Sequence, residues 1–146
     1  MSVAFRRESD EEHKEPRFEL PIPPGPNLVR PSGLALIEEK VASLEAVATR
    51  DEEQARALRY WRTRLATAQV APAPPADEVA FGSVVRFRLA GAERSVTIVG
   101  DDEADPAAGL IAYSAPLARA LIGAGEGESV AFNGREDAVE ILSIGH

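Results

Sequence analysis

The chain has 146 residues, 45% of them hydrophobic and 27% charged, which is the composition of an ordinary globular protein with one domain and room for an appendage. The absence of cysteine excludes disulfides and thiolate metal sites, and two histidines, His13 and His146, are too few for a histidine-based metal or acid–base site. The net charge is −8, and residues 71–146 alone carry five basic and twelve acidic side chains, which disfavours direct nucleic-acid binding and favours a basic protein partner.

The first 30 residues combine mixed charge with the proline-rich run PIPPGP at positions 21–26. Such a composition cannot bury a core, and its prolines favour extended backbone. We therefore predict a flexible, proline-rich N-terminal arm over residues 1–30. Leu20 and Ile22 are the arm's candidates for local docking.

Residues 31–70 carry two runs of apolar side chains spaced three or four positions apart, which is the pattern of amphipathic helices. A short connection containing Thr49 and Asp51 separates the runs, and either side chain can cap the second helix. Two similar helices joined by a short link form an antiparallel hairpin whose apolar seams cover each other. The predicted seam residues are Leu34, Ile37, Val41, Leu44, Leu58, Trp61 and Leu65.

A second unit is predicted beyond the hairpin. The prolines of residues 71–77 indicate a stiff linker, and residues 78–146 follow it as a small domain. One short helix is expected over 116–122, with Ser114 as its N-cap, Pro116 in its first turn and Gly123 as its stop. A single helix on a curved antiparallel sheet gives an α+β domain. The five strands of that sheet are predicted at 84–89, 94–99, 110–113, 129–132 and 138–144.

Four blocks in this domain resemble the C-terminal domain of the Gre family of bacterial transcription factors, GreA and GreB. They are VAFGSVV at 79–85, IVGDDEAD at 98–105, SAPLARALIG at 114–123 and GEGESV at 125–130. Several ordered blocks with matching spacing are more specific than any one short motif. The resemblance implies an FKBP-like fold for residues 78–146 and a protein that binds bacterial RNA polymerase.

The hairpin resembles the family's N-terminal coiled coil only at its base, through RPSGL at 30–34 and RLATAQV at 64–70. For full-length members, the resemblance implies a longer hairpin that enters the polymerase's secondary channel, where tip carboxylates help to bind a second Mg²⁺ that activates water for cleavage of backtracked RNA. Here each helix has about 17 to 20 residues, and losing three turns retracts a tip by about 16 Å. Carboxylate–Mg²⁺ coordination requires about 2 Å. The chain is therefore identified as a short-hairpin, Rnk-like member with no catalytic, cofactor-binding or metal-binding residues.

The hairpin tip and the second helix carry charges that allow two interpretations. The tip acids can be a relocated acidic pair, or they can stabilise a helix N-terminus through its dipole, which is the interpretation we favour. Arg56, Arg59 and Arg62 recur every three residues and can contact an acidic channel wall or phosphates; a solvated face balanced by glutamates is favoured. The predicted tip residues are Arg50, Asp51, Glu52 and Glu53.

An acidic loop formed by Asp101, Asp102, Glu103 and Asp105 suits a cation, a basic partner or plain solvation. The resemblance implies that the nearby element 114–121 docks on the polymerase's rim helices, and Ser114 there stands where relatives have Asp or Asn. Covering of the sheet by Leu117 is compatible with such docking. The predicted polymerase-binding residues are Asp101, Asp102, Ser114, Pro116, Leu117 and Arg119.

Four hypotheses follow for function. The leading one is a regulator, and not an enzyme, that occupies the secondary-channel entrance of RNA polymerase and competes with other channel ligands. The second is a cleavage stimulator that uses Asp51 with Glu52 or Glu53. The third is a prolyl isomerase by analogy of fold, and the fourth is an adaptor that recruits a partner through its arm. We expect a cytoplasmic monomer that meets nucleic acid only through the transcription complex and contacts no membrane, since no apolar run approaches the roughly 20 residues of a membrane span.

Overall fold

A computed structural model describes residues 19–145, which divide into two units. In the described part of the chain, the first unit contains residues 19–25 and 37–67, and the second contains residues 26–36 and 68–145. The start of the predicted hairpin and the predicted linker thus pack with the sheet domain. The first 18 residues of the predicted arm lie outside the described residues. No helix within residues 19–145 is long and apolar enough to cross a membrane.

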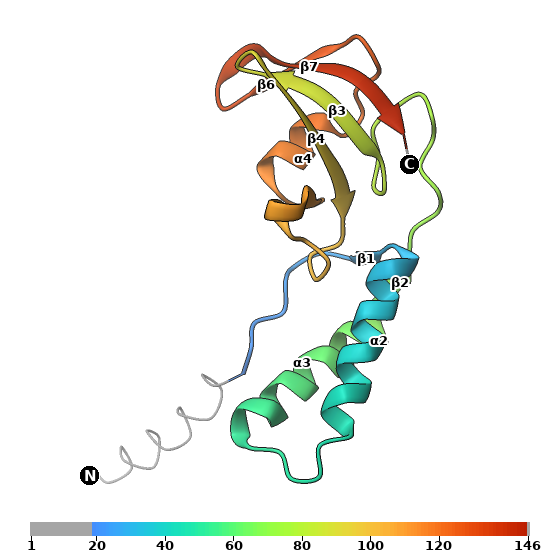
Figure 1. The fold of residues 1–146 in the computed structure, drawn as a ribbon, viewed down its shortest axis with the longest axis vertical. Coiled ribbons are helices and arrows are strands. Elements are labelled where there is room, and N and C mark those ends of the chain that lie inside the picture. Colours follow the sequence, from blue (N-terminus) through green and yellow to red (C-terminus); the bar gives the residue numbers. More distant parts are fainter. Residues whose placement is uncertain (1–18, 146) are drawn as a thin grey trace, which may run out of the picture. The chain divides into compact units, whose positions relative to one another are not determined.

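The hairpin consists of helix α2 (Pro31–Glu45) and helix α3 (Glu52–Thr67), which run antiparallel (Figure 1). Three of the predicted seam residues, Ile37, Val41 and Leu58, are buried. The remaining predicted seam residues, Leu34, Leu44, Trp61 and Leu65, are half-buried. The two helices have 15 and 16 residues, so both are shorter than the sequence suggested, because α2 ends six residues before Asp51 and the chain leaves α3 as a strand.

The buried charge of the hairpin was not predicted. Arg64 on α3 is only 2% exposed, although arginine is usually a surface residue. Its guanidinium carbon lies 6.0 Å from the centre of the Tyr60 ring, one turn earlier on the same helix. Across the hairpin, the Lys40 ammonium lies 5.9 Å from the Trp61 ring. Both distances lie near the outer limit of cation–π contacts.

The second unit contains a five-stranded sheet in the order β5-β4-β3-β7-β6. All five predicted strands are present, as β3 (Val84–Leu89), β4 (Ala92–Val99), β5 (Leu110–Ala112), β6 (Ser129–Phe132) and β7 (Arg135–Gly145). The prediction of a fully antiparallel sheet was wrong for one pair, since β4 and β5 are parallel. Residues 100–109, including a short 3-10 helix, η2 (Pro106–Ala108), carry the chain back along β4 before β5 begins. The α+β class is confirmed.

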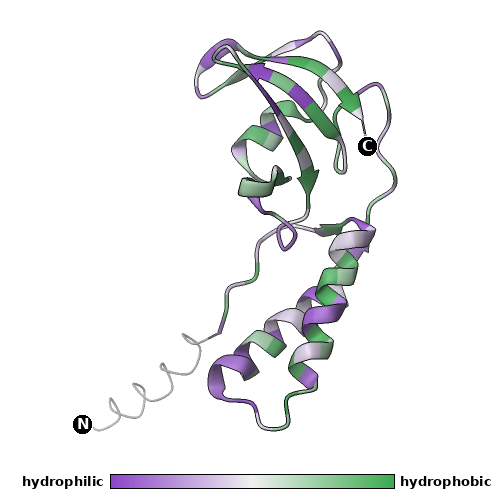
Figure 2. Ribbon diagram, viewed as in Figure 1, coloured by the Kyte–Doolittle hydropathy of each residue, from purple (hydrophilic) through white to green (hydrophobic). Residues whose placement is uncertain are grey.

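One face of this sheet forms the core of the second unit. Phe87, Ile98 and Ile141 point inward from three strands and are fully buried, and Ala118 and Leu121 of helix α4 (Pro116–Leu121) pack against them. Residues Val84 to Phe87 of β3 alternate between exposed and buried, and Figure 2 shows hydrophobic and hydrophilic residues along the same strand. This alternation is what a strand with one buried and one solvated face requires.

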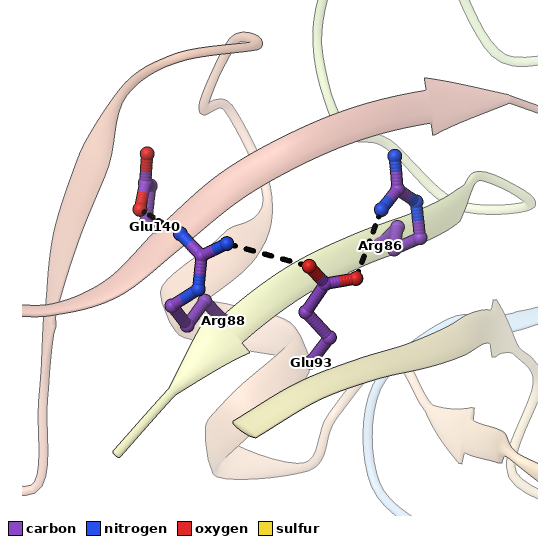
Figure 3. A network of polar contacts seen from close by, with 4 residues as sticks. All are labelled: Arg86, Arg88, Glu93 and Glu140. Carbon is purple, nitrogen blue, oxygen red and sulfur yellow. Dashed lines mark hydrogen bonds and ion pairs between the residues drawn. The ribbon is translucent and has the colours of Figure 1, made fainter. Parts of the chain in front are cut away.

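The opposite face of the sheet carries a ladder of charges (Figure 3). Glu93 on β4 accepts hydrogen bonds from Arg86 and Arg88 of β3, at 3.0 and 3.3 Å, and Arg88 also donates to Glu140 of β7 at 2.7 Å. Arg88 stands opposite both glutamates in the strand register, so these are direct cross-strand pairs. The four side chains neutralise one another, which favours a solvated face over a charged binding surface.

Two short strands form a second, parallel sheet that the sequence did not reveal. Strand β1 (Asn27–Val29) pairs with β2 (Ala68–Val70), and the Ala71 N–H extends the ladder to the Val29 carbonyl at 3.1 Å. Residues 27–29 were predicted as flexible arm and residues 68–70 as the end of a helix. Both predictions were wrong there, because each segment gains its hydrogen bonds from a partner about 40 positions away, which no local pattern records.

Candidate functional site

Helix α4 presents a buried and an exposed side. Ala118 and Leu121 are completely buried against the sheet, whereas Pro116, Arg119 and Ile122 are exposed. Pro116 and Arg119 are three positions apart, which places them on one side of the helix, and Ile122 is the extended residue that follows it. Leu117 lies between these two sides of the helix. It is half-buried and packs against the core, so it helps to cover the sheet. Pro116 occupies the first turn, as predicted, where its missing N–H costs no hydrogen bond.

Ser114 and Asp101 are brought together by the fold. The Ser114 hydroxyl donates to Asp101 Oδ1 at 2.7 Å, joining the turn before α4 to the turn after β4. The prediction that Ser114 caps α4 was wrong: Ala115 is the N-cap residue, and it has no side-chain cap bond. The serine hydroxyl is instead committed to the aspartate. Two of the predicted docking residues, 13 positions apart in sequence, therefore form one polar pair at the surface.

Glu103, which the sequence grouped with the acidic loop, has a different role. Its carboxylate accepts hydrogen bonds from Arg30 Nε at 3.1 Å, from Arg30 Nη2 and from Ser32 Oγ at 2.7 Å. Burial would raise the pKa of Glu103, but the hydrogen bonds from Arg30 and Ser32 and the charge of Arg30 together lower it. The glutamate therefore stays ionised and ties the acidic loop to the start of α2.

Gly33 and Gly100 allow the start of α2 to lie next to Glu103 and β1 to lie next to the end of β4. A Cβ on Gly33 would lie 3.0 Å from a Glu103 carboxylate oxygen, and a Cβ on Gly100 would lie 2.3 Å from the Leu28 carbonyl oxygen. The second distance is impossible for a real side chain, so only glycine lets β1 approach the end of β4. The Tyr113 hydroxyl also donates to the Pro26 carbonyl, just before β1.

The cation interpretation of the acidic loop finds no support in the described part of the chain. Within residues 19–145, no three acidic or imidazole side chains are grouped so that they could hold a metal ion. Glu103 points to Arg30 and Asp101 to Ser114, so the acids separate instead of converging. Asp105 is exposed, and Asp101 and Asp102 are half-exposed.

Of the predicted tip residues, Arg50 and Asp51 lie in the connection between the hairpin helices and stabilise its backbone, whereas Glu52 and Glu53 begin α3. Asp51 Oδ1 accepts from the Gln54 N–H at 2.7 Å, while Gln54 Oε1 accepts from the Asp51 N–H at 3.0 Å. This reciprocal arrangement is a capping box, and it confirms Asp51 as the cap. Arg50 donates to the carbonyl of Leu44 at the end of α2 at 3.0 Å. Glu52 and Glu53 are exposed in the first turn of α3.

The comparison with known families accounts for the second unit. Residues 74–146 match the family model described as transcription elongation factor GreA/GreB, C-terminal. The chain belongs to the GreA/GreB family. A GreB of Neisseria meningitidis is 43% identical over 96 residues, which cover 61% of this chain and 58% of that protein. A GreA of Helicobacter pylori is 41% identical over 73 residues, covering 47% of this chain and 44% of that protein.

The chain thus spans about half the length of the curated GreA and GreB relatives it matches. Among solved structures, the elongation factor GreA/GreB from Nitrosomonas europaea aligns with 84% of this chain and 100% of its own, at 22% identity and a TM-score of 0.42. The matched family region contains α4 and the acidic loop. The matched region does not include the residues that bind or approach Glu103, which are Arg30, Ser32 and Gly33. No site was predicted for these three residues, and the sequence singled them out only as part of the RPSGL block.

Proposed function

We propose that this Gre-family chain binds bacterial RNA polymerase and occupies the entrance of its secondary channel without stimulating RNA cleavage. The contact is assigned to the α4 surface, which we define as Asp101, Asp102, Ser114, Pro116, Leu117 and Arg119. Exposure of Pro116 and Arg119, together with the polar pair formed by Ser114 and Asp101, supports this assignment. The excess of acidic groups in residues 71–146 suits a basic protein surface.

The length of the hairpin carries the non-catalytic part of the proposal. Helix α2 has 15 residues and α3 has 16, so each extends only about 23 Å at 1.5 Å per residue. The resemblance implies hairpins several turns longer in full-length cleavage factors, and three turns correspond to about 16 Å. A carboxylate must approach within about 2 Å of Mg²⁺ to coordinate it. The Asp51 carboxylate is, in addition, committed to the capping box.

A transcript-cleavage assay on a stalled, backtracked polymerase tests this directly. We expect no cleavage above the factor-free rate, and we expect the chain to slow cleavage by a bona fide GreB through competition. The informative variant is Asp51→Asn with Glu52→Gln and Glu53→Gln, because asparagine also caps helices and the variant loses charge without losing the cap. Cleavage by the native chain that disappears in this variant would show that the protein is a cleavage stimulator.

A pull-down with RNA polymerase tests the α4 surface separately. We expect Arg119→Glu combined with Pro116→Ala to weaken binding at least tenfold, and Arg135→Glu, an exposed arginine of the same unit outside that surface, to leave binding unchanged. Leu117 is avoided as a test position because it packs against the core. If RNA polymerase retained both variants equally, α4 would not be part of the interface.

A further inference from the structure

Residues 19–22 contact helix α3 within the first unit, and an ion pair anchors them there. Arg59 donates from Nε to Glu19 Oε1 at 3.0 Å and from Nη2 to Glu19 Oε2 at 2.6 Å. This is the two-bond geometry in which arginine binds carboxylates most specifically. The hydrogen bond from Arg59 is the largest influence on the pKa of Glu19 and lowers it, so the carboxylate remains charged in this contact.

Apolar side chains flank the ion pair. Leu20 and Ile22 are 43% and 45% exposed, so each residue is partly covered although it lies at the surface. Together with Glu19 they line a cavity of about 260 Å³ whose other wall is formed by Arg59, Tyr60 and Thr63. A carboxylate followed by alternate apolar residues thus lies on one exposed stretch of α3.

The arginines of α3 differ in where their partners come from. Arg62 pairs with Glu45 of α2 at 2.9 Å, so its charge is neutralised inside the hairpin. Arg59, three residues earlier and equally exposed, pairs with a carboxylate that belongs to neither helix. Loss of the Glu19 contact would therefore uncover Arg59 without disturbing the contacts between the two helices.

We propose that residues 19–22, here called the cover segment, form a releasable cover over α3 in which Glu19 occupies Arg59 and withholds it from carboxylates of a partner protein. An acidic protein surface is the competitor expected, because Arg59 already binds a carboxylate through two hydrogen bonds, and a partner's carboxylate can reproduce that geometry. Exposed ion pairs of this kind contribute little stability and are screened by salt, so the cover opens easily.

Cross-linking in the isolated protein tests the cover itself. The chain has no cysteine, so Leu20→Cys with Thr63→Cys, two positions that line the same cavity, creates a unique thiol pair. A short bismaleimide should link this pair quickly. Adding Arg59→Gln should slow the reaction severalfold, as should 0.5 M salt, whereas Arg62→Gln, the matched control, should leave its rate unchanged.

The charge reversal Glu19→Arg with Arg59→Glu should restore the rate, because it rebuilds the ion pair with opposite polarity. The cover is ruled out by a rate that is indifferent to Arg59→Gln, by equal slowing in Arg62→Gln, or by failure of the reversal to restore the rate.

The masking of Arg59 from a partner rests on the proposed function, and a polymerase-binding measurement tests it. Glu19→Gln should bind RNA polymerase more tightly, by at most about fivefold at low salt, and addition of Arg59→Gln should cancel the gain. If the native chain binds polymerase but Glu19→Gln brings no gain, the masking is wrong while the proposed function stands. If the native chain does not bind polymerase, the proposed function fails, and cross-linking still decides whether the cover exists.

Discussion

Within residues 19–145, each unit contains one arginine whose Nε and Nη2 bind the two oxygens of a single carboxylate. Arg30 and Glu103 lie in the second unit, with side chains 29% and 9% exposed; Arg59 and Glu19 lie in the first, with side chains 53% and 49% exposed. A third donor, Ser32, also binds Glu103, whereas within residues 19–145 the side chain of Glu19 accepts hydrogen bonds from Arg59 only.

The difference between these pairs lies in what surrounds them. The Arg30–Glu103 pair sits where β1 approaches Gly100 so closely that the backbone permits little rearrangement. Removing one partner there leaves a partly buried charge without compensation. Around the Arg59–Glu19 pair, water replaces either partner at little cost. Although the hydrogen-bond geometry of the two pairs is similar, the Arg30–Glu103 pair fixes the structure of its unit, whereas the Arg59–Glu19 pair allows the cover segment to be released.

The largest expected effect comes from the backbone contact next to Glu103. Gly100→Ala should lower the free energy of unfolding by more than about 3 kcal/mol, because its Cβ would lie 2.3 Å from the Leu28 carbonyl oxygen. Urea denaturation followed by circular dichroism measures this. Gly145→Ala is the control, since a Cβ there meets nothing within 4 Å. Equal stability of the two variants would mean that β1 does not pack on Gly100.

Breaking the ion pair of the second unit should cause the next largest loss in the free energy of unfolding. Arg30→Gln should cost about 2 kcal/mol, the loss expected when hydrogen bonds to a partly buried carboxylate are removed. Arg86→Gln, which breaks an exposed pair of the sheet ladder, should stay within about 0.5 kcal/mol. The same denaturation experiment compares the two. Similar losses would show that burial does not distinguish them.

The pH dependence of stability should also reveal Glu103. Since folding lowers the pKa of Glu103 below its ordinary value near 4.5, its contribution is complete at neutral pH and is lost as pH falls through the lowered pKa. The stability gap between the native chain and Glu103→Gln should therefore be widest at pH 7 and shrink below about pH 4. Unfolding curves from pH 7 to pH 3 measure the gap. A gap that does not change with pH would contradict the ionised pair.

The smallest effect on stability is expected for the pair in the first unit. Arg59→Gln should leave the urea midpoint of the protein unchanged, because solvent replaces Glu19 at the arginine site, while the cover segment becomes free. A clear fall in the midpoint would show that this contact is structural, and the contrast between the two pairs would then disappear.

Local patterns predicted most of the sheet domain and little of the junction before it. Alternating residues identified β3 at its observed bounds, and Asp51 was one of the two predicted caps, because both signals lie within a few neighbouring residues. Strand β1 has only three residues and lies after a proline-rich run, so it has no period to detect. The role of Glu103 depends on Arg30, 73 positions away, and an acidic run offers no sign of which acid turns inward.

The candidate docking residues show the same division. Pro116 could be placed at the start of α4 from its preference for the first helical turn. The bond between Ser114 and Asp101 could not be foreseen, because the serine had an equally reasonable local use as a cap. Residue type therefore predicted the place of Pro116 in the helix, and only the fold shows that Ser114 and Asp101 touch.

Strands β1 and β2 have one more consequence. The chain enters α2 directly after β1 and leaves α3 directly into β2, so a parallel ladder closes both ends of the helical insertion. Helical turns can be added to or removed from α2 and α3 in matched numbers without altering a residue of the β1–β2 ladder. The length of the hairpin is thereby independent of the architecture of the sheet domain. A factor of this design can be lengthened or shortened by inserting or deleting helical turns while its sheet domain stays intact.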